Sequence, residues 1–300
     1  MDNVMNKNQG LEKDQAKKTV KTQKKMGGPQ SKKGYGRLLL NIAVWIVVMF
    51  PLIYGFLMAL KPAADLYNPD AILFTKSPTL SNFTQAFTSA PIHIYIKNSL
   101  IVSIAITFLQ ILNSMFAGFA FRFTNFKLKG PIYALILATM MIPGEAVIIS
   151  QFLMVSSWGL NDSLVVLILP YMVSAFNIFL CTQALESFPY ELYEAAKIDG
   201  CSNLRFIFTI MIPLLKPTIG AMAVQSFLSG WNMYMWPLLV TNNDNARTVQ
   251  IGISMLRSED SQSLVLMVAG VIICMIPSLM IFVFGQKNMV KGLTAGAVKG

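Results

Sequence analysis

Charge is scarce in this sequence. Only 13% of the 300 residues are Asp, Glu, Lys or Arg, whereas 54% are hydrophobic, and the mean hydropathy is +0.56. Soluble domains carry about 25% charged residues. The composition therefore excludes an ordinary soluble domain and predicts a protein that lies largely within a membrane.

Patterns for catalysis and metal binding are missing as well. The one histidine, His93, falls in a predicted loop, and the three cysteines lack the spacing of metal ligands. No nucleophile–base pair can be recognised, and the phosphate-binding signature G-x-x-x-x-G-K-[ST] does not occur. We expect no catalytic residues, no metal site and no cofactor in this chain, which is therefore not an enzyme by itself.

The net charge of +10 does not indicate a nucleic-acid partner. Residues 1–37 hold ten of the 24 Lys and Arg residues against three acidic ones, so this segment accounts for +7 of the excess. Such a segment is most simply a disordered cytosolic tail, and attraction to anionic membrane lipid is the alternative. Because the apolar run after it continues for a full span, it does not resemble a cleaved signal peptide.

Six apolar stretches are long enough to cross a bilayer as helices, since a hydrocarbon core of about 30 Å needs roughly 20 residues. We predict an all-α integral membrane protein with six transmembrane helices, a transmembrane domain over 38–285 and a short tail over 286–300. The stretches are Leu38–Leu60, Asn98–Phe121, Pro131–Ser156, Ser163–Leu185, Pro213–Val240 and Ser263–Gly285.

The distribution of Lys and Arg sets the expected orientation, because these residues favour the cytoplasmic side. With both termini in the cytoplasm, the inner segments carry 19 of them and the outer segments five; without the long tail the split is nine to five. We therefore expect cytoplasmic termini and a cytoplasmic polar segment at 186–216. The outer loops are then 61–97, 157–162 and 241–262.

The polar segment at 186–216 predicts two short helices joined by a sharp bend. Ser187 is a suitable N-cap for the first helix, and Pro189 suits its first turn. Gly200 should end this helix, because glycine accepts the left-handed conformation found after helix ends. An ordinary amphipathic connector would have the same features.

Ser202 can cap the second helix, Asn203–Ile212, which we expect to stop at Pro213. The first helix should present a small, acidic face and pack apolar side chains back on the spans. The side chains predicted to pack are Leu192, Tyr193 and Ile198.

The spacing of Glu194-Ala195-Ala196, Gly200 and Ile210-x-Ile212-Pro213 resembles the EAA motif of permease subunits of bacterial ABC importers, with isoleucine for the usual leucine before the proline. Other short matches are similar to the carbohydrate-uptake branch, which includes the maltose transporter. They are Asn98-Ser99-Leu100, the run 117–123, Trp158-Gly159-Leu160-Asn161-Asp162, and Phe227 with Trp231-Asn232.

This resemblance implies the ABC importer type I permease fold in a bacterial cytoplasmic membrane, with the polar segment as a cytoplasmic coupling helix. The implied partners are a second homologous permease, two ABC ATPase subunits that bind ATP and Mg, an extracellular solute-binding protein, and a sugar. The residues implied to couple to the ATPase are Glu191, Glu194, Ala195, Ala196, Asp199 and Gly200.

Polar and aromatic side chains inside the predicted spans are candidates for the translocation pathway, because such groups are costly unless they face the bundle interior or water. Hydrogen bonding between helices and an interfacial aromatic belt explain them equally well. The candidates are Asn113, Glu145, Gln151, Asn177, Gln225, Trp231, Asn232 and Tyr234.

The last outer loop, 241–262, occupies the position that contacts the sugar-binding protein in maltose-type systems. We expect it to be a re-entrant or partner-contacting segment, with a solvated connector as the alternative. The candidate contact residues are Asn242, Asn243, Asp244 and Arg247.

Three alternatives to a sugar importer stay open at this stage. The first keeps the class but changes the cargo to a polyol, glycerol phosphate or another non-sugar solute. The second is an ATP-independent secondary transporter, which predicts internal repeats and ion-coupling acids in the spans. The third, a membrane scaffold or receptor, leaves the EAA spacing unexplained.

Overall fold

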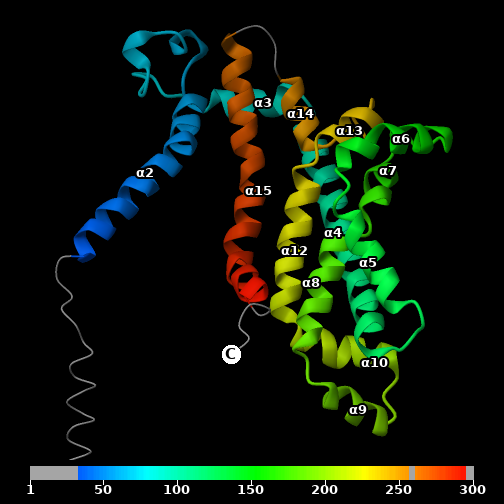
Figure 1. Ribbon diagram of the computed structural model, residues 1–300. Coiled ribbons are helices and arrows are strands. Elements are labelled where there is room, and N and C mark those ends of the chain that lie inside the picture. Colours follow the sequence, from blue (N-terminus) through cyan, green and yellow to red (C-terminus); the bar gives the residue numbers. More distant parts are fainter. Residues whose placement is uncertain (1–32, 257–260, 295–300) are drawn as a thin grey trace, which may run out of the picture. The chain divides into compact units, whose positions relative to one another are not determined.

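The computed structural model describes residues 33–256 and 261–294, and all regular secondary structure in these ranges is helical (Figure 1). The chain divides into two compact units, residues 1–54 and 55–300. The elements are α2 (Lys33–Ala59), η1 (Ala63–Asp65), η2 (Pro69–Ala71), α3 (Ser81–Ser89), α4 (Ile92–Phe123), α5 (Lys129–Thr139), α6 (Gly144–Ser157), α7 (Leu164–Ile168), η3 (Leu169–Tyr171), α8 (Ala175–Glu186), α9 (Tyr190–Ile198), α10 (Asn203–Phe206), the π-helical η4 (Ile207–Met211), α11 (Ile212–Leu214), α12 (Lys216–Trp231), α13 (Met235–Val240), α14 (Val249–Met255) and α15 (Ser261–Thr294).

In the first unit, the described residues belong to α2, an apolar helix that contains Pro51. Its large side chains are exposed within this chain; Leu39 is 68% and Val47 71% accessible. A helix that is apolar on all sides suits surroundings of lipid or partner helices. The helix already begins at Lys33, inside the segment predicted as a tail, and residues 1–32 of that tail lie outside the described residues.

Three of the six predicted spans are single long helices. They are Gly36–Ala59, Ile92–Phe123 and Leu264–Gln286, and each is long and apolar enough to cross a membrane. Helix α15 runs on to Thr294, so helical structure extends into the predicted tail at 286–300.

The other three predicted spans are bent pairs of helices. The third bends by 95° between α5 and α6, where Pro143, which has no N–H to donate, is the N-cap of α6. The fourth bends by 46° before α8. The fifth bends by 86° at Leu215, between Asn203–Leu214 and α12. Helix α12 ends at Trp231 and α13 is a separate helix, so the predicted stretch Pro213–Val240 is not one continuous helix. Counted with the bent pairs, the described chain has up to six spans.

Helix α4 is the centre of the second unit and packs against α8, α12 and α14. Glycines let the helices come close. A Cβ atom on Gly118 would lie 2.5 Å from the Cys181 sulfur, and one on Gly285 would lie 2.1 Å from a Val224 methyl group. Small residues at such contacts are the usual means of helix packing in membranes, where lipid is as apolar as leucine.

A buried polar network joins α4, α8 and α12. The Asn177 side-chain amide donates to Gln110 Oε1 at 3.0 Å and to Ser226 Oγ at 2.8 Å, and Ser226 Oγ donates to the same Gln110 oxygen at 2.7 Å. Gln110 Nε2 donates to the Tyr171 carbonyl at 2.7 Å. These bonds fix the three helices in register, because unpaired polar groups are costly in an apolar interior.

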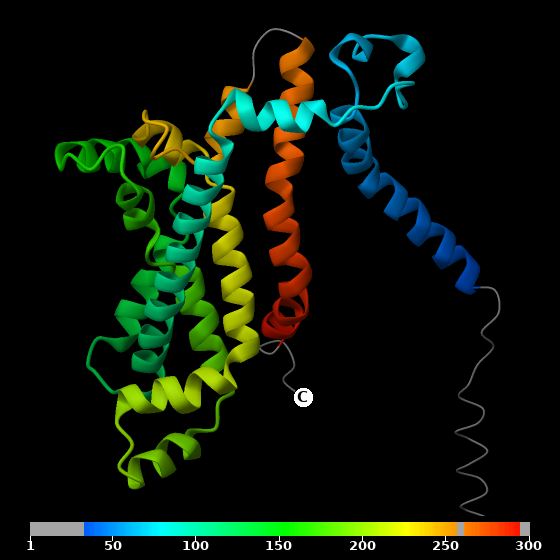
Figure 2. The same cartoon turned by 180° about the vertical axis from the view of Figure 1, so that it is seen from behind.

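The two views agree that α9 and α10 lie at one end of the second unit and α13 and α14 at the other (Figures 1 and 2). Helix α4 runs between these ends. A polar segment and a polar loop therefore face opposite sides of the same helical bundle.

Candidate functional site

Helix α9 follows directly after α8 and begins without a side-chain cap. Pro189 is its N-cap residue, in an extended conformation, while Ser187 has helical angles and ends α8, donating its hydroxyl to the Ala184 carbonyl at 3.0 Å. The prediction that Ser187 caps α9 is therefore wrong. A serine needs extended backbone angles to cap a following helix, whereas Ser187 has helical angles as the C-cap of α8.

Gly200 ends α9 as predicted. Its φ of +73° is in the left-handed region, its N–H bonds to the Lys197 carbonyl at 3.1 Å, and the Cys201 N–H bonds to the Ala196 carbonyl at 2.8 Å. This pair of bonds is the Schellman arrangement, which satisfies carbonyls at the helix end. A Cβ at Gly200 would meet no atom within 4 Å, so the requirement for glycine here is conformational and not steric.

The second helix begins as predicted but does not stop at Pro213. The Ser202 hydroxyl accepts the Arg205 N–H at 3.3 Å, and helical structure continues from Asn203 through Leu214. The π-helical turn η4 precedes the proline and is closed by the Ile212 N–H on the Ile207 carbonyl. This wider turn accommodates the proline ring, which would otherwise clash with the carbonyl four residues earlier.

Most of α9 faces away from the spans. Glu191, Glu194, Ala195, Asp199 and Gly200 are exposed, which leaves five of the six predicted coupling residues accessible. The exception is Ala196, which packs inward.

Ala196 is only 7% accessible and belongs to the apolar cluster beneath the helix. Of the three side chains predicted to pack back, Tyr193 does so, but Leu192 is 41% and Ile198 86% exposed, so the prediction is wrong for these two. A nine-residue helix has room for only one inward stripe, and Tyr193 and Ala196 occupy it. The exposed Ile198 leaves an apolar side chain beside the acidic face.

An aromatic cluster connects α9 to the end of α4. The ring of Phe123 lies 4.7 Å from that of Tyr193 and 5.4 Å from that of Phe206, and Phe119 and Phe188 complete the group. Tilted and edge-to-face ring contacts at these distances add to the stability from burial alone. The surface helix pair is therefore fixed to a spanning helix by packed rings.

Three of the predicted pathway residues make contacts between helices or at a break in one. Asn177 belongs to the buried network with Gln110 and Ser226. Asn113 donates to the Met172 carbonyl at 3.1 Å, where η3 breaks before α8. Trp231 is 1% accessible and donates from its ring nitrogen to the Cys274 carbonyl at 3.1 Å.

The other pathway candidates do not form a single group. Gln151 is half-buried on α6, and Glu145 is exposed in the first turn of that helix, after the 95° bend. Gln225, Asn232 and Tyr234 are exposed on or just after α12.

A polar stripe runs along the exposed side of α12. It consists of Gln225, Ser229 and Asn232, at the spacing of one helix face, and Gln225 Nε2 lies 3.4 Å from Ser229 Oγ. Gln250 extends it with a contact of 3.5 Å to Asn232. The sequence interpretation missed Ser229, although the spacing of four and three residues from its neighbours was the available signal. Such a stripe on a spanning helix requires a cavity or a polar partner.

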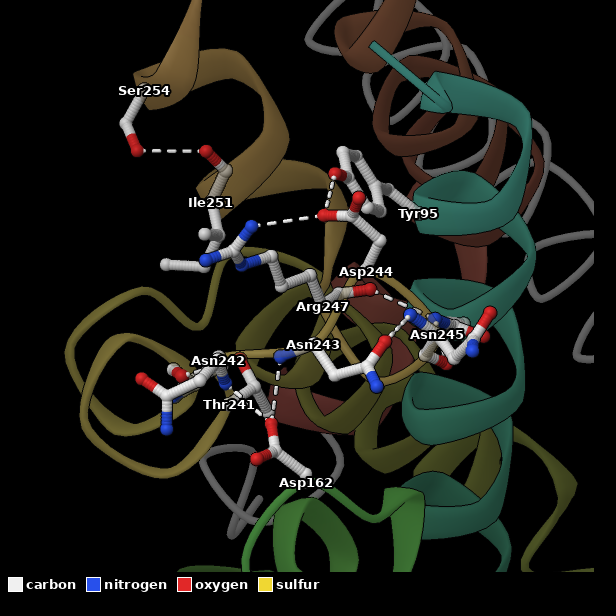
Figure 3. Close-up of polar contacts among 12 residues, drawn as sticks. Tyr95, Asp162, Thr241, Asn242, Asn243, Asp244, Asn245, Arg247, Ile251 and Ser254 are labelled. Carbon is white, nitrogen blue, oxygen red and sulfur yellow. Dashed lines mark hydrogen bonds and ion pairs between the residues drawn. The ribbon is translucent and has the colours of Figure 1, made fainter.

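At the opposite end, the loop 241–248 is held by hydrogen bonds (Figure 3). The Asp162 carboxylate accepts the backbone N–H groups of Asn242 and Asn243, the latter at 2.8 Å. These bonds hold the pKa of Asp162 below its usual value. The carboxylate therefore stays charged at neutral and mildly acidic pH.

Asp244 and Arg247, two of the predicted binding-protein contacts, pair with each other at 2.9 Å, and the Tyr95 hydroxyl donates to Asp244 at 2.7 Å. Both hydrogen bonds lower the pKa of Asp244. The charges of Asp244 and Arg247 are thus paired within the chain. Asn242 and Asn243, the other two predicted contacts, remain exposed.

The loop continues into α14, which is packed and not solvated. Val249, Ile251 and Ile253 are buried, the Val249 N–H bonds to the Ser99 hydroxyl at 2.9 Å, and Gly252 lies against the Tyr95 ring. This burial excludes a solvated connector over 249–253, and the re-entrant or partner-contacting role of the loop stays a prediction. Residues 257–260 of the predicted loop lie outside the described residues.

Three features together indicate a membrane transport subunit. The chain has apolar spans, a surface helix pair fixed to one of them, and a polar stripe along another. The comparisons give the family. The chain belongs to the inner membrane components of binding-protein-dependent transport systems, whose family model matches residues 110–294.

Relatives and a solved structure agree with this assignment. The chain is 33% identical over 257 residues to the arabinooligosaccharides transport system permease protein AraQ of Halalkalibacterium halodurans, covering 85% of this chain and 92% of that one. It is 31% identical to the sn-glycerol-3-phosphate transport system permease protein UgpE of Pectobacterium atrosepticum, covering 86% and 95%. A bacterial ABC transporter that imports the acidic polysaccharide alginate contains a chain of the same fold, with a TM-score of 0.77 at 19% identity, covering 86% of this chain and 99% of that one.

These findings confirm the predicted all-α fold, the ABC importer permease resemblance and a multi-pass protein of the inner membrane. The assignments of individual residues to coupling, pathway and binding-protein contact stay predictions.

Proposed function

We propose that this chain is a transmembrane subunit of an ATP-driven importer that carries a sugar or oligosaccharide. It pairs with a second permease and two ABC ATPase subunits, which bind ATP and Mg, and an extracellular binding protein delivers the cargo. The observation that carries the proposal is α9: an exposed acidic helix with a fixed end, resting on rings that belong to a spanning helix.

The exposed face of α9 suits a cleft on a separate protein. Glu191 and Glu194 can pair with basic side chains there, Ala195 allows close approach, and Ile198 supplies an apolar contact. When the ATPase subunits close, the aromatic cluster passes the displacement of α9 to α4. With α9 in the cytoplasm, the loop 241–248 lies outside. The distribution of Lys and Arg along the sequence supports cytoplasmic termini.

The polar stripe on α12 supports a neutral, hydroxyl-rich cargo. Gln225, Ser229 and Asn232 offer amide and hydroxyl groups, which match sugar hydroxyls. Glycerol phosphate is named for three of the relatives, but a phosphate group favours Arg or Lys, and the stripe has neither. Membership in a binding-protein-dependent family favours the importer over a secondary transporter, and Glu145 lies exposed at a bend.

The test is reconstitution with the second permease, the ATPase subunits and the binding protein in liposomes. We expect co-purification of the ATPase and ATP hydrolysis that rises when the binding protein is loaded with a member of a sugar panel. If glycerol 3-phosphate stimulates ATP hydrolysis and none of the sugars does, the cargo is glycerol phosphate and not a sugar. Failure to bind any ABC ATPase would refute the importer.

Replacing Gln225 by leucine should lower uptake by roughly tenfold, because a lost hydrogen bond to cargo of about 1.5 kcal/mol corresponds to that factor. Initial uptake rates in liposomes measure this. Gln225→Asn keeps the amide and should retain most of the uptake. Equal uptake by the leucine variant and the wild type would remove the stripe from the pathway.

A further inference from the structure

We propose that Asp162 is a positioning residue, which holds the loop 241–248 in the shape that receives the binding protein. This inference rests on the proposed function and adds a residue from a different loop to the docking surface. Asp162 both accepts hydrogen bonds from this part of the chain and donates one to it. The carboxylate of Asp162 accepts two backbone N–H groups, from Asn242 and Asn243, while its own N–H donates to the Val240 carbonyl at 2.9 Å.

The backbone of Asp162 is shaped for this contact. Its φ of 57° makes it the one non-glycine residue with positive φ in the described chain. Such a conformation is uncommon outside glycine, and Asp and Asn tolerate it best. It lies between α6 and α7, directly before Ser163, whose hydroxyl caps α7 by accepting the Val166 N–H at 3.3 Å. The carboxylate is therefore held by a short loop fixed at the start of a helix.

The Asp162 clamp, meaning its carboxylate's two bonds to the Asn242 and Asn243 N–H groups, acts on the end of the loop that α4 does not reach. From α4, Asn98 donates to the carbonyls of Asn245 and Arg247, both at 2.9 Å, and Tyr95 donates to Asp244. These bonds fix residues 244–247. Asp162 fixes the N–H groups of the two residues before them. Asn243 is also held by its carbonyl and its Oδ1, which accept N–H groups of residues 245–247, so removing the carboxylate loosens Asn242 most.

The clamp also determines what the loop presents. The backbone N–H groups of Asn242 and Asn243 point to Asp162, and both residues are exposed (Figure 3). The Asn243 Oδ1 accepts the Asn245 N–H at 3.0 Å, so among the described contacts the Asn242 side chain and the Asn243 NH2 group are what the loop offers a partner. The ion pair of Asp244 with Arg247 neutralises the neighbouring charges. The surface offered is amide-rich and nearly neutral, which fits a polar, uncharged patch on the binding protein.

The experiment compares Asp162→Gly, Asp162→Asn and Asn161→Gly in the full complex with both permeases, the ATPases and the binding protein. Glycine keeps the positive φ and removes the acceptor; asparagine keeps both. Asn161→Gly is the matched control in the same loop, because the Asn161 side chain bonds only to Ser156 among the described contacts.

We expect Asp162→Gly to raise the amide exchange rates of residues 242–243 and the apparent Kd for the loaded binding protein, each by at least about tenfold, because each of the two amides loses its hydrogen bond to a charged group. Asn161→Gly should stay within about twofold of wild type on the same scale. Asp162→Asn, which replaces the charged acceptor by a neutral one, should lie between wild type and the glycine variant. The proposal is overturned if Asp162→Gly leaves both quantities unchanged, or if Asp162→Asn loosens the loop equally. If the wild-type complex does not respond to any binding protein, the proposed function fails, while the exchange measurement still tests the clamp.

Discussion

Substituting valine for Gly200 should uncouple ATP hydrolysis from transport without preventing membrane insertion. The residue has a φ of +73°, and its N–H and that of Cys201 close the end of α9 on the Lys197 and Ala196 carbonyls. A residue with a Cβ pays roughly 1–2 kcal/mol in this conformation, and β-branching adds to the strain. The cheaper alternative is to open the helix end, which would change the surface offered to the ATPase.

The expected size of this effect is large because the docking surface is small. Opening the helix end displaces Asp199 and Ile198 together, so several contacts are lost at once. We expect uptake at least tenfold below wild type in liposomes, where about 1.4 kcal/mol already corresponds to a factor of ten. Gly200→Asn is the matched control, since asparagine tolerates positive φ. Normal uptake by the valine variant would show that the helix end has no part in coupling.

Charge reversal at Glu194 tests the same surface by another route. Its side chain is exposed and contributes little to folding, so Glu194→Lys should leave the amount of inserted protein unchanged. If it pairs with a basic ATPase residue, reversal replaces attraction by repulsion, and Glu194→Gln should give an intermediate loss. An unaltered rate for the lysine variant would assign the coupling contact to other residues of α9.

Local rules in the sequence were sufficient where one residue type decides the conformation. Gly200 and Ser202 are such cases, since a left-handed position and a side-chain cap depend on neighbours in the chain. The polar segment between apolar stretches was equally visible. The structure confirms both helix boundaries at these residues.

The same local rules were insufficient where packing against residues far away in the sequence determines the conformation. Ser187 has the side chain of an N-cap, but it is the C-cap of α8 and has helical backbone angles. Pro213 would be expected to break a helix, but a π-helical turn accommodates its ring. The inward stripe of α9 depends on the rings of Phe119, Phe123 and Phe206, whose positions no spacing within α9 reveals.

Hydrogen bonds between residues far apart in the sequence could not be predicted from it either. Asp162 lies about 80 residues from the loop that it holds, and Tyr95 lies 149 residues from Asp244. Each of these residues looks like an ordinary loop or span position when it is read alone. Without the fold, the charges at 244 and 247 were naturally interpreted as contacts for a partner, although they pair with each other.

Removing the Phe123 ring should both destabilise the protein and disconnect α9 from α4. Phe123 is 7% accessible and makes ring contacts of 4.7 to 5.8 Å with residues of three other segments. Truncation of a buried phenylalanine to alanine costs about 3–5 kcal/mol in transfer and cavity terms. We expect Phe123→Ala to lower the thermal midpoint of the detergent-solubilised complex and to remove the stimulation of ATP hydrolysis by the binding protein.

Two further variants separate packing from a general loss of apolar volume. Phe123→Leu keeps most of the volume but loses the ring contacts, each worth about 0.5–1.5 kcal/mol beyond burial, so it should fold and yet respond weakly. Phe284→Ala makes the same change on α15, where the ring is 76% exposed within this chain, and should leave stimulation intact. If Phe123→Leu responds fully to the binding protein, the displacement of α9 reaches the spans by the chain connections to α8 and α12 and not by the rings. The position of Phe123 at the end of α4 argues against that route, because its ring touches both Tyr193 and Phe206 and therefore moves when either surface helix moves.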